Sequence, residues 1–250
     1  MKKFAIIIPA RYNSSRFPGK PLALINGKTL IEHVYDKCLK TTDKKNIFIA
    51  TDDKRIGNFL KIKKIKYIYT SRYCLTGTDR VAEASLKMKT KIIINVQGDE
   101  PMISHLDIKK IIKAKLTYPD HIICGYNDID NYQQVLNLNV PKIVKNSEND
   151  LIYISRSPIP GSKVKHSNVT KFYRQVCIYA FNKNQLMKFY NLRKKSKVEK
   201  CEDIELLRFF ELDEKIKVVK LSNKSIAVDV KEDIKKVELE ITKLLSTRKR

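Results

Sequence analysis

The sequence predicts an α/β protein with a mostly parallel sheet and helices on both of its faces. Short, continuous apolar runs recur through the first half of the chain, as in strands that are covered on both faces. Segments with apolar residues at helical spacing separate these runs, and this alternation is typical of strands joined by crossover helices. The length of 250 residues is enough for one substantial hydrophobic core.

In the first half, strands and helices are expected to alternate. The expected strands are residues 3–9, 46–52, 66–71, 91–101 and 121–126, the fourth of which ends in an acidic turn. The expected helices are residues 29–40, 53–64, 79–88 and 106–116. The first of these has Leu30, Ile31, Val34, Cys38 and Leu39 on one face. The third has Asp79 near its N-terminus, where a carboxylate is favourable.

From about residue 130 the pattern changes to one of paired antiparallel strands. Strands are expected at 140–146, 151–157, 174–181 and 215–221, with a short extended segment at 225–230. Helices are expected at 182–192, 202–212 and 231–245. No linker separates the two halves, so residues 1–250 are expected to form one domain in which residues 130–181 are an antiparallel subregion.

The composition narrows the class of protein. The net charge of +24 could indicate binding to nucleic acid or to an anionic membrane, but the lysines are spread along the whole chain, which favours a solvated basic surface. The five cysteines are scattered and form no CxxC pair, which argues against disulfides and a zinc site. The apolar run near the N-terminus is too short for a signal peptide, so a cytoplasmic protein is expected.

A basic loop follows the first expected strand. In "IPARYNSSRFPGKPL", residues 8–22, Arg11, Arg16 and Lys20 stand beside Gly19, and there is no acidic residue. Ligands of open α/β sheets bind at the carboxyl ends of the strands, where these cations could converge on phosphate oxygens. The spacing fits neither a Walker A loop nor a GxGxxG fingerprint, and a solvated basic turn is the alternative.

Carboxylates follow two other extended segments. Asp99 and Glu100 stand in "NVQGDEP", at the end of the fourth strand, and Asp229 stands in "SIAVDVKED". A carboxylate at a strand end is well placed to hold Mg²⁺ against phosphates, although a plain Gly-Asp turn is a common alternative. Asp229 could be a turn residue or a second metal ligand, because Glu232 and Asp233 are also available to cap the last helix.

Several segments together resemble the sugar cytidylyltransferases of the CMP-3-deoxy-manno-octulosonate (CMP-Kdo) synthetase family. The similar segments are "IPARYNSSRFPGKPL", "GTDRVAEA" (77–84), "NVQGDEPMI" (95–103), "ISRSPIP" (154–160) and "AVDVKEDI" (227–234). They occur in order over nearly the whole chain. The resemblance implies a nucleotidyltransferase sheet of Rossmann-like type, and CMP transfer from CTP to an ulosonic acid in lipopolysaccharide or capsule synthesis. It also implies a homodimer joined through the antiparallel subregion.

The resemblance assigns roles to residues whose types match the family's motifs. Arg11, Lys20 and Asp99 match catalytic positions. The nucleotide-binding set adds Arg16, Gly77, Thr78 and Arg80, of which Arg80 would face the base. Mg²⁺ would be held by Asp99 and Asp229. The sugar-binding set is Gln97, Tyr179 and Glu205, together with Gln175, which matches by position but not by residue type.

The departures from the family pattern all fall in the sugar half. Gln175 stands where the family has histidine, Leu206 stands where it has glutamine, and the loop at 161–174 is short. Polar mismatches in a pocket discriminate strongly between substrates. These departures leave 8-amino-3,8-dideoxy-manno-octulosonate open as the alternative acceptor, while Kdo is expected because it is the usual substrate of the family that the sequence resembles. A basic nucleic-acid-binding module is the alternative from a different class, although the dispersed tyrosines do not favour it.

Overall fold

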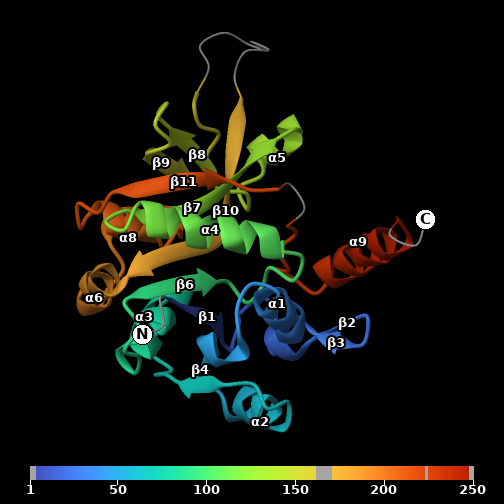
Figure 1. Cartoon of the computed structure of the whole chain (residues 1–250). Coiled ribbons are helices and arrows are strands. Elements are labelled where there is room, and N and C mark those ends of the chain that lie inside the picture. The colour runs from blue at the N-terminus through green and yellow to red at the C-terminus, as the bar shows by residue number, and fades with distance from the viewer. Residues whose placement is uncertain (1–3, 162–170, 223–224, 248–250) are drawn as a thin grey trace.

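The computed structural model describes residues 4–161, 171–222 and 225–247. Its main sheet has the strand order β11-β7-β10-β6-β1-β4-β5 (Figure 1). The bounds are β1 (Ala5–Ala10), β4 (Ile47–Thr51), β5 (Tyr67–Tyr69), β6 (Ile92–Val96), β7 (Ile122–Ile129), β10 (Phe172–Asn182) and β11 (Ile216–Lys220). β6, β1, β4 and β5 pair in parallel, as do β7 and β11. β10 lies antiparallel between β6 and β7, and the predicted mostly parallel α/β sheet is confirmed.

Helices cover both faces of the sheet, as the apolar strand runs predicted. One face packs against α3 (Gly77–Leu86), α6 (Lys183–Asn191) and α8 (Leu207–Phe210). The other packs against α1 (Leu30–Leu39), α2 (Lys54–Ile62) and α4 (His105–Thr117). Alternate residues of β1 pack into the hydrophobic cores on the two faces of the sheet, Ile7 on the first face and Ile6 and Ile8 on the second.

Local sequence sets where several helices begin. Capping boxes start α1 (Thr29 with Glu32), α3 (Thr76 with Asp79) and α6 (Asn182 with Gln185). In each box a side-chain oxygen accepts from the N–H three residues on, and the partner side chain accepts from the cap N–H. These contacts fix the helix starts independently of the distant sheet.

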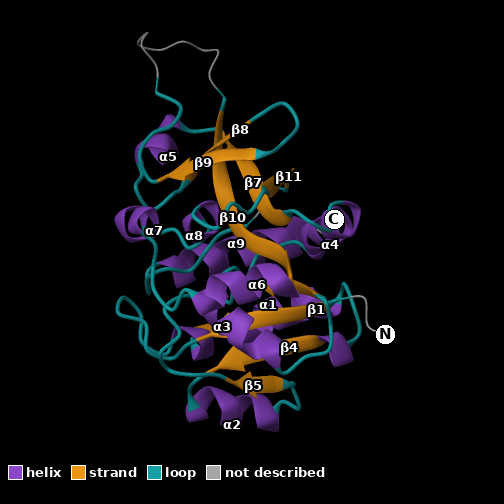
Figure 2. Ribbon diagram, turned by 90° about the vertical axis from the view of Figure 1, so that its left-hand side faces the viewer, coloured by secondary structure: helices purple, strands orange, loops and turns teal. Residues whose placement is uncertain are grey.

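The second half contains the predicted antiparallel pairing. β8 (Lys142–Lys145) pairs with β9 (Leu151–Ser155) and with β10, so that both strands branch from the main sheet at its upper end in Figures 1 and 2. A short helix, α5 (Tyr132–Leu136), lies nearby. The register of β10 against β7 shifts between Val176 and Tyr179, so a bulge falls at Cys177.

Three local features differ from the expectations. The helix expected at 202–212 is reduced to the short α8, and an additional helix, α7 (Lys197–Glu202), comes just before it; Asp203 takes a left-handed conformation with φ of 50° and ends α7. The described part of 225–230 forms no strand. A small hairpin, β2 (Leu24–Ile25) with β3 (Lys28–Thr29), was not predicted, and it packs beside the last helix, α9 (Asp233–Thr247). No helix in the described ranges combines the length and the apolar character that a membrane span needs.

Candidate active site

The basic loop after β1 folds back on itself. The carbonyl oxygen of Tyr12 accepts hydrogen bonds from the N–H groups of Ser14, at 3.0 Å, and Gly19, at 2.8 Å. Gly19 has a φ of 73°, which favours glycine, and it leads into a short 3₁₀ helix, η1 (Lys20–Leu22). The fold of the loop thus directs Lys20 back toward the ends of the strands, while Arg11 stays exposed beside β1.

Two of the three predicted phosphate cations contact the two predicted metal carboxylates. Lys20 Nζ lies 3.0 Å from Asp99 Oδ2 and donates to the carbonyl oxygen of Val228 at 2.7 Å. Arg16 Nη2 lies 3.2 Å from Asp229 Oδ1. Residues that are far apart in sequence therefore meet at one edge of the sheet, in the arrangement that the basic loop and the acidic turn predicted.

Tight packing places Asp99 at this edge. A Cβ on Gly98 would lie 2.6 Å from the carbonyl oxygen of Pro9, so only glycine lets the end of β6 pass the end of β1 this closely. The carbonyl oxygen of Asp99 accepts from the N–H of Val228 at 2.9 Å. This bond joins the acidic turn directly to the segment that carries Asp229.

The donor set suits Mg²⁺. Asp99 and Asp229 supply hard carboxylate oxygens, and Mg²⁺ in nucleotide sites is usually held by one or two carboxylates together with substrate phosphates. No cluster of three or more potential metal-ligating side chains occurs among the described residues. Two carboxylates would leave positions on the ion for phosphate oxygens and water. The residues present fit an ion that binds together with a nucleotide.

Two of the predicted sugar-binding residues contact each other at the end of β6. Gln97 Nε2 donates to Glu205 Oε1 at 2.9 Å, and the N–H of Thr78 donates to Glu205 Oε2 at 2.9 Å. Removal from water raises the pKa of Glu205, and the hydrogen bond from Thr78 opposes this rise. Glu205 therefore links β6 to the first turn of α3, where the predicted nucleotide residues Gly77 and Thr78 lie.

The other two predicted sugar-binding residues form a second pair on β10. Gln175 Nε2 donates to the Tyr179 hydroxyl at 3.0 Å, and both side chains are buried. Leu206 is fully buried in the apolar core on the α3 and α8 side. The structure thus places Leu206 among apolar side chains, where it makes no polar contact.

Arg80 lies in the first turns of α3, just after the predicted nucleotide-binding residues Gly77 and Thr78. Its guanidinium donates to Asp52 at 3.0 Å, to Thr70 Oγ1 at 2.6 Å and to the carbonyl oxygen of Ser71 at 3.4 Å. Arg80 is 3% exposed. In this arrangement it supports the segment after β5, and its contact with a base stays a prediction.

Sequence reasoning assigned no site role to several polar residues in or next to the acidic turn. Glu100 accepts a short hydrogen bond from the Ser225 hydroxyl, and burial raises the pKa of Glu100 to about 6. Arg174 donates to the carbonyl oxygen of Ser225 at 3.0 Å. Cys177 lies at the β10 bulge, where burial and the charges of Glu100 and Asp99 raise its pKa. Only Glu100 had a signal in the sequence, because it follows Asp99 directly.

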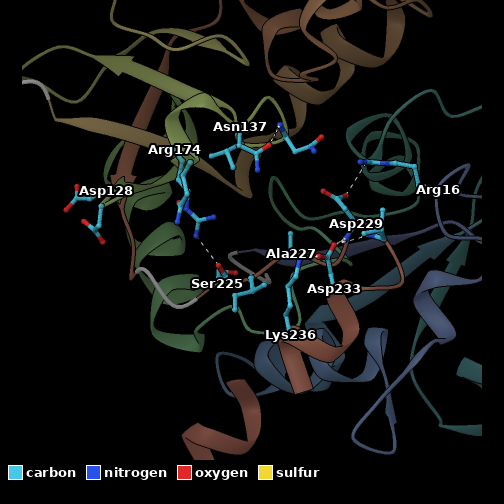
Figure 3. A pocket seen from close by; sticks show the side chains of 15 residues that line it. Arg16, Asp128, Asn137, Arg174, Ser225, Ala227, Asp229, Asp233 and Lys236 are labelled. Atoms are coloured by element: carbon cyan, nitrogen blue, oxygen red, sulfur yellow. Dashed lines mark hydrogen bonds and ion pairs between the residues drawn. The ribbon is translucent and has the colours of Figure 1, made fainter. Parts of the chain in front are cut away.

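A cavity of about 640 Å³ opens beside these residues (Figure 3). Arg16 and Asp229 lie on one side of it and Arg174 and Asp128 on the other, and Ser225 and Ala227 also line it. Of the predicted site residues, Arg16 and Asp229 border this space, which is large enough for a substrate group.

Comparison with known proteins assigns the family. The sequence profile described as "Cytidylyltransferase" matches residues 5–216. The chain belongs to the cytidylyltransferase family. The 3-deoxy-manno-octulosonate cytidylyltransferase of Christiangramia forsetii is 35% identical over 253 residues, which cover 98% of this chain and 97% of the relative. The 8-amino-3,8-dideoxy-manno-octulosonate cytidylyltransferase of Shewanella frigidimarina is 35% identical over 245 residues, covering 96% and 98%.

Solved structures place this cytidylyltransferase in the same fold. The structure of CMP:2-keto-3-deoxy-manno-octonic acid synthetase complexed with CTP is 32% identical and has a TM-score of 0.89. The similarity covers 97% of this chain and 99% of that chain. A glucose-1-phosphate thymidylyltransferase structure from Bacillus anthracis, which is 12% identical with a TM-score of 0.67, shares the fold alone. The predicted nucleotidyltransferase fold and the family resemblance are both confirmed.

Proposed function

We propose that this enzyme transfers CMP from CTP to the anomeric hydroxyl of Kdo, forming CMP-Kdo and pyrophosphate. The main support is the convergence of Lys20 and Arg16 with Asp99 and Asp229 at the ends of β1 and β6. Full-length relatives that carry this activity in their names give independent support. The proposal also rests on the CTP complex of the similar solved structure.

The geometry explains how these side chains would promote the reaction. Attack on the α-phosphorus builds negative charge that must be stabilised as pyrophosphate leaves, and fixed cations do this without reorganisation. Lys20, half-buried in front of the strand ends, is placed to contact the phosphates, while Arg11 and Arg16 approach from the exposed loop. When bound, Mg²⁺ would screen the phosphate charge. Asp99 and Asp229 would hold it.

The acceptor would be held on the other side of the strand ends. Gln97 and Glu205 share a hydrogen bond there and could exchange it for sugar hydroxyls. Tyr179 and Gln175 lie on β10 and form the second hydrogen-bonded pair. These polar groups would orient the attacking hydroxyl, since positioning is a major part of catalysis in such transfers.

Two sugars are candidates for the acceptor of this site. Relatives named for Kdo and for the 8-amino sugar are equally similar to this chain, at 35% identity. Neither sugar is favoured by overall similarity to these two relatives, so the distinction falls to residues that would contact the acceptor, such as Gln175. Leu206 is fully buried in the apolar core and has no exposed surface with which to contact a sugar. Kdo is the proposed acceptor, and the 8-amino sugar is the alternative.

A panel of acceptors with CTP held fixed tests the proposal. The enzyme, Mg²⁺ and CTP are incubated with Kdo, with the 8-amino derivative or with N-acetylneuraminate, and pyrophosphate release is measured. We expect the highest kcat/KM with Kdo. A preference for the 8-amino sugar would select the alternative, and no pyrophosphate with any acceptor would contradict the proposed reaction.

We further propose that the enzyme works as a Mg²⁺-dependent cytoplasmic homodimer in lipopolysaccharide or capsule synthesis. The exposed apolar residues Ile152 and Tyr153 support the dimer, because they lie on β9, which pairs only with β8 among the described strands. An exposed apolar edge of this kind is usually covered in the working protein.

A further inference from the structure

The segment that carries Asp229 has no regular secondary structure of its own. Its described residues 225–230 form neither helix nor strand, yet Asp229 must stay close to Asp99 if the two are to share an ion. Contacts with neighbouring elements must therefore hold this segment in place.

Contacts with the acidic turn hold the start and the middle of the segment. The Ser225 hydroxyl donates to Glu100 Oε2, and the N–H of Val228 donates to the carbonyl oxygen of Asp99 at 2.9 Å. Arg174 adds a bond from Nη2 to the carbonyl oxygen of Ser225 at 3.0 Å (Figure 3). The adjacent residues Asp99 and Glu100 thus bind the segment at two points, Val228 and Ser225.

The end of the segment is held by α9. Asp233 Oδ2 accepts from the N–H groups of Asp229, at 3.0 Å, and Val230, at 3.1 Å. Between the two ends, Val228 is fully buried against Ile25, Leu30 and Met102. From the basic loop, Arg16 contacts Asp229 and Lys20 donates to the carbonyl oxygen of Val228, but both cations are expected to engage phosphates.

Adjacent carboxylates of the turn have different environments. The Asp99 side chain is 32% exposed and contacts Lys20, whereas Glu100 is 5% exposed and contacts Ser225, which is 6% exposed. Asp99 can therefore reach a bound ion. The Glu100 carboxylate instead points into the protein and accepts a hydrogen bond from Ser225, in the segment that carries Asp229.

We propose that Glu100 is a positioning residue that sets the spacing of Asp99 and Asp229 by holding Ser225, with Arg174 fixing the carbonyl of the same serine. This inference rests on the proposed metal site. Residues that orient metal ligands usually affect metal affinity without touching the ion. Loss of the Glu100–Ser225 bond should therefore weaken the ion more than the nucleotide.

The test measures the affinity for Mn²⁺ in the presence of a non-hydrolysable CTP analogue, with electron paramagnetic resonance as the readout of bound ion. Ser225→Ala should weaken Mn²⁺ binding by about tenfold or more, in the range found for such supporting residues. Affinity for the analogue in EDTA should stay within a factor of about two, because that measurement involves no ion. The conservative Glu100→Gln, whose amide oxygen can still accept from Ser225, should keep most of the Mn²⁺ affinity.

Ser222→Ala is the matched control. The Ser222 hydroxyl also donates to a buried carboxylate, that of Asp107 on α4, but it does not touch the acidic turn. This variant should bind Mn²⁺ like the wild type. If Ser225→Ala does not fold, the double variant Glu100→Gln/Ser225→Ala removes the same bond without leaving a buried charge, and it should show the same loss.

Three results would overturn the inference. They are unchanged Mn²⁺ affinity in Ser225→Ala, an equal loss of analogue affinity in EDTA, and an equal loss of Mn²⁺ affinity in Ser222→Ala. Absence of Mn²⁺ binding in the wild type with the analogue would instead contradict the proposed metal site itself, and the inference would fall with it.

Discussion

The role of Lys20 could be predicted in part from the sequence alone. Its place in a basic, glycine-containing loop after an apolar strand predicted a phosphate contact. The structure adds that Lys20 is half-buried and contacts Asp99 and the carbonyl oxygen of Val228, so it connects three segments. Those partners could not be predicted from the loop alone, because they depend on how distant segments meet.

Lys20→Ala should therefore lower kcat/KM for CTP by about 10²-fold or more, the usual cost of losing one preorganised charge-stabilising group. Steady-state pyrophosphate release measures this. Lys28→Ala is the control, because Lys28 pairs with Asp36 in an exposed ion pair away from the site, and it should leave the rate unchanged. A rate for Lys20→Ala within threefold of wild type would remove Lys20 from the phosphate site.

The thiols give a second prediction at the residue scale. Burial raises the pKa of Cys74 to about 12 and raises the pKa values of Cys38, Cys124 and Cys177, so these four thiols should react slowly near neutral pH. Cys201 is exposed. Labelling of the native protein with iodoacetamide, followed by peptide mass spectrometry, should show one fast site at Cys201 that Cys201→Ser abolishes. Equally fast labelling of Cys177 would contradict the predicted burial effect.

At the scale of elements, a buried charge cluster joins α3 to α7 and α8. Arg208 donates to Asp79 Oδ1 at 2.8 Å and to Glu199 Oε2 at 2.6 Å, and Arg208 and Glu199 are fully buried. Asp79 and Glu199 also complete the capping boxes of their helices. The cluster therefore links the predicted nucleotide loop to the segment that carries Glu205.

Arg208→Met should lower the free energy of unfolding by about 3–5 kcal/mol, because two buried carboxylates lose their counter-charge. Denaturant unfolding followed by circular dichroism measures the loss. Arg193→Met is a matched control: Arg193 stacks on Tyr190 at 3.8 Å, as Arg208 does on Phe189 at 3.8 Å, but it is exposed. Equal destabilisation of the two variants would show that the stacking, not the charge cluster, matters.

Elements with strong local signals were predictable, and those set by tertiary contacts were not. The strands of the main sheet and helices α1, α3 and α4 follow from apolar periodicity and end signals, with boundaries displaced by a few residues. The break between α7 and α8 depends on Asp203 in a left-handed conformation, which few non-glycine residues adopt. The 225–230 segment reads as extended in sequence, but it is held by Glu100, Asp99 and Asp233 rather than by a neighbouring strand.

For the whole molecule, the family resemblance named Arg16, Lys20, Asp99 and Asp229, which the structure brings together at one sheet edge, while their nucleotide and metal roles stay predictions. It was less informative for the sugar half, where Leu206 lies in the apolar core and Gln175 bonds to Tyr179. The reason is physical: one edge of a parallel sheet collects the strand ends, whereas the side chains of β10 depend on its bulge and on the packing of the antiparallel subregion.

The proposed homodimer gives a prediction at this scale. Light scattering should show a dimer, and Ile152→Asp, which puts a charge on the exposed edge strand β9, should yield a monomer because burying that charge is costly. Ile62→Asp is the control, since Ile62 is 78% exposed on α2 at the other end of the sheet. A monomeric wild type, or a dimer that survives Ile152→Asp, would contradict an interface through this edge.

The central claim is that Asp99 supports CMP transfer from CTP to Kdo. Its most direct measurement is the formation of CMP-Kdo from CTP, Kdo and Mg²⁺ by the wild type and by Asp99→Asn, followed by phosphorus NMR. The wild type should form CMP-Kdo and pyrophosphate in equal amounts, and Asp99→Asn should form almost none while keeping the wild-type circular dichroism spectrum. No CMP-Kdo from the wild type, or a near-normal rate from Asp99→Asn, would contradict the account.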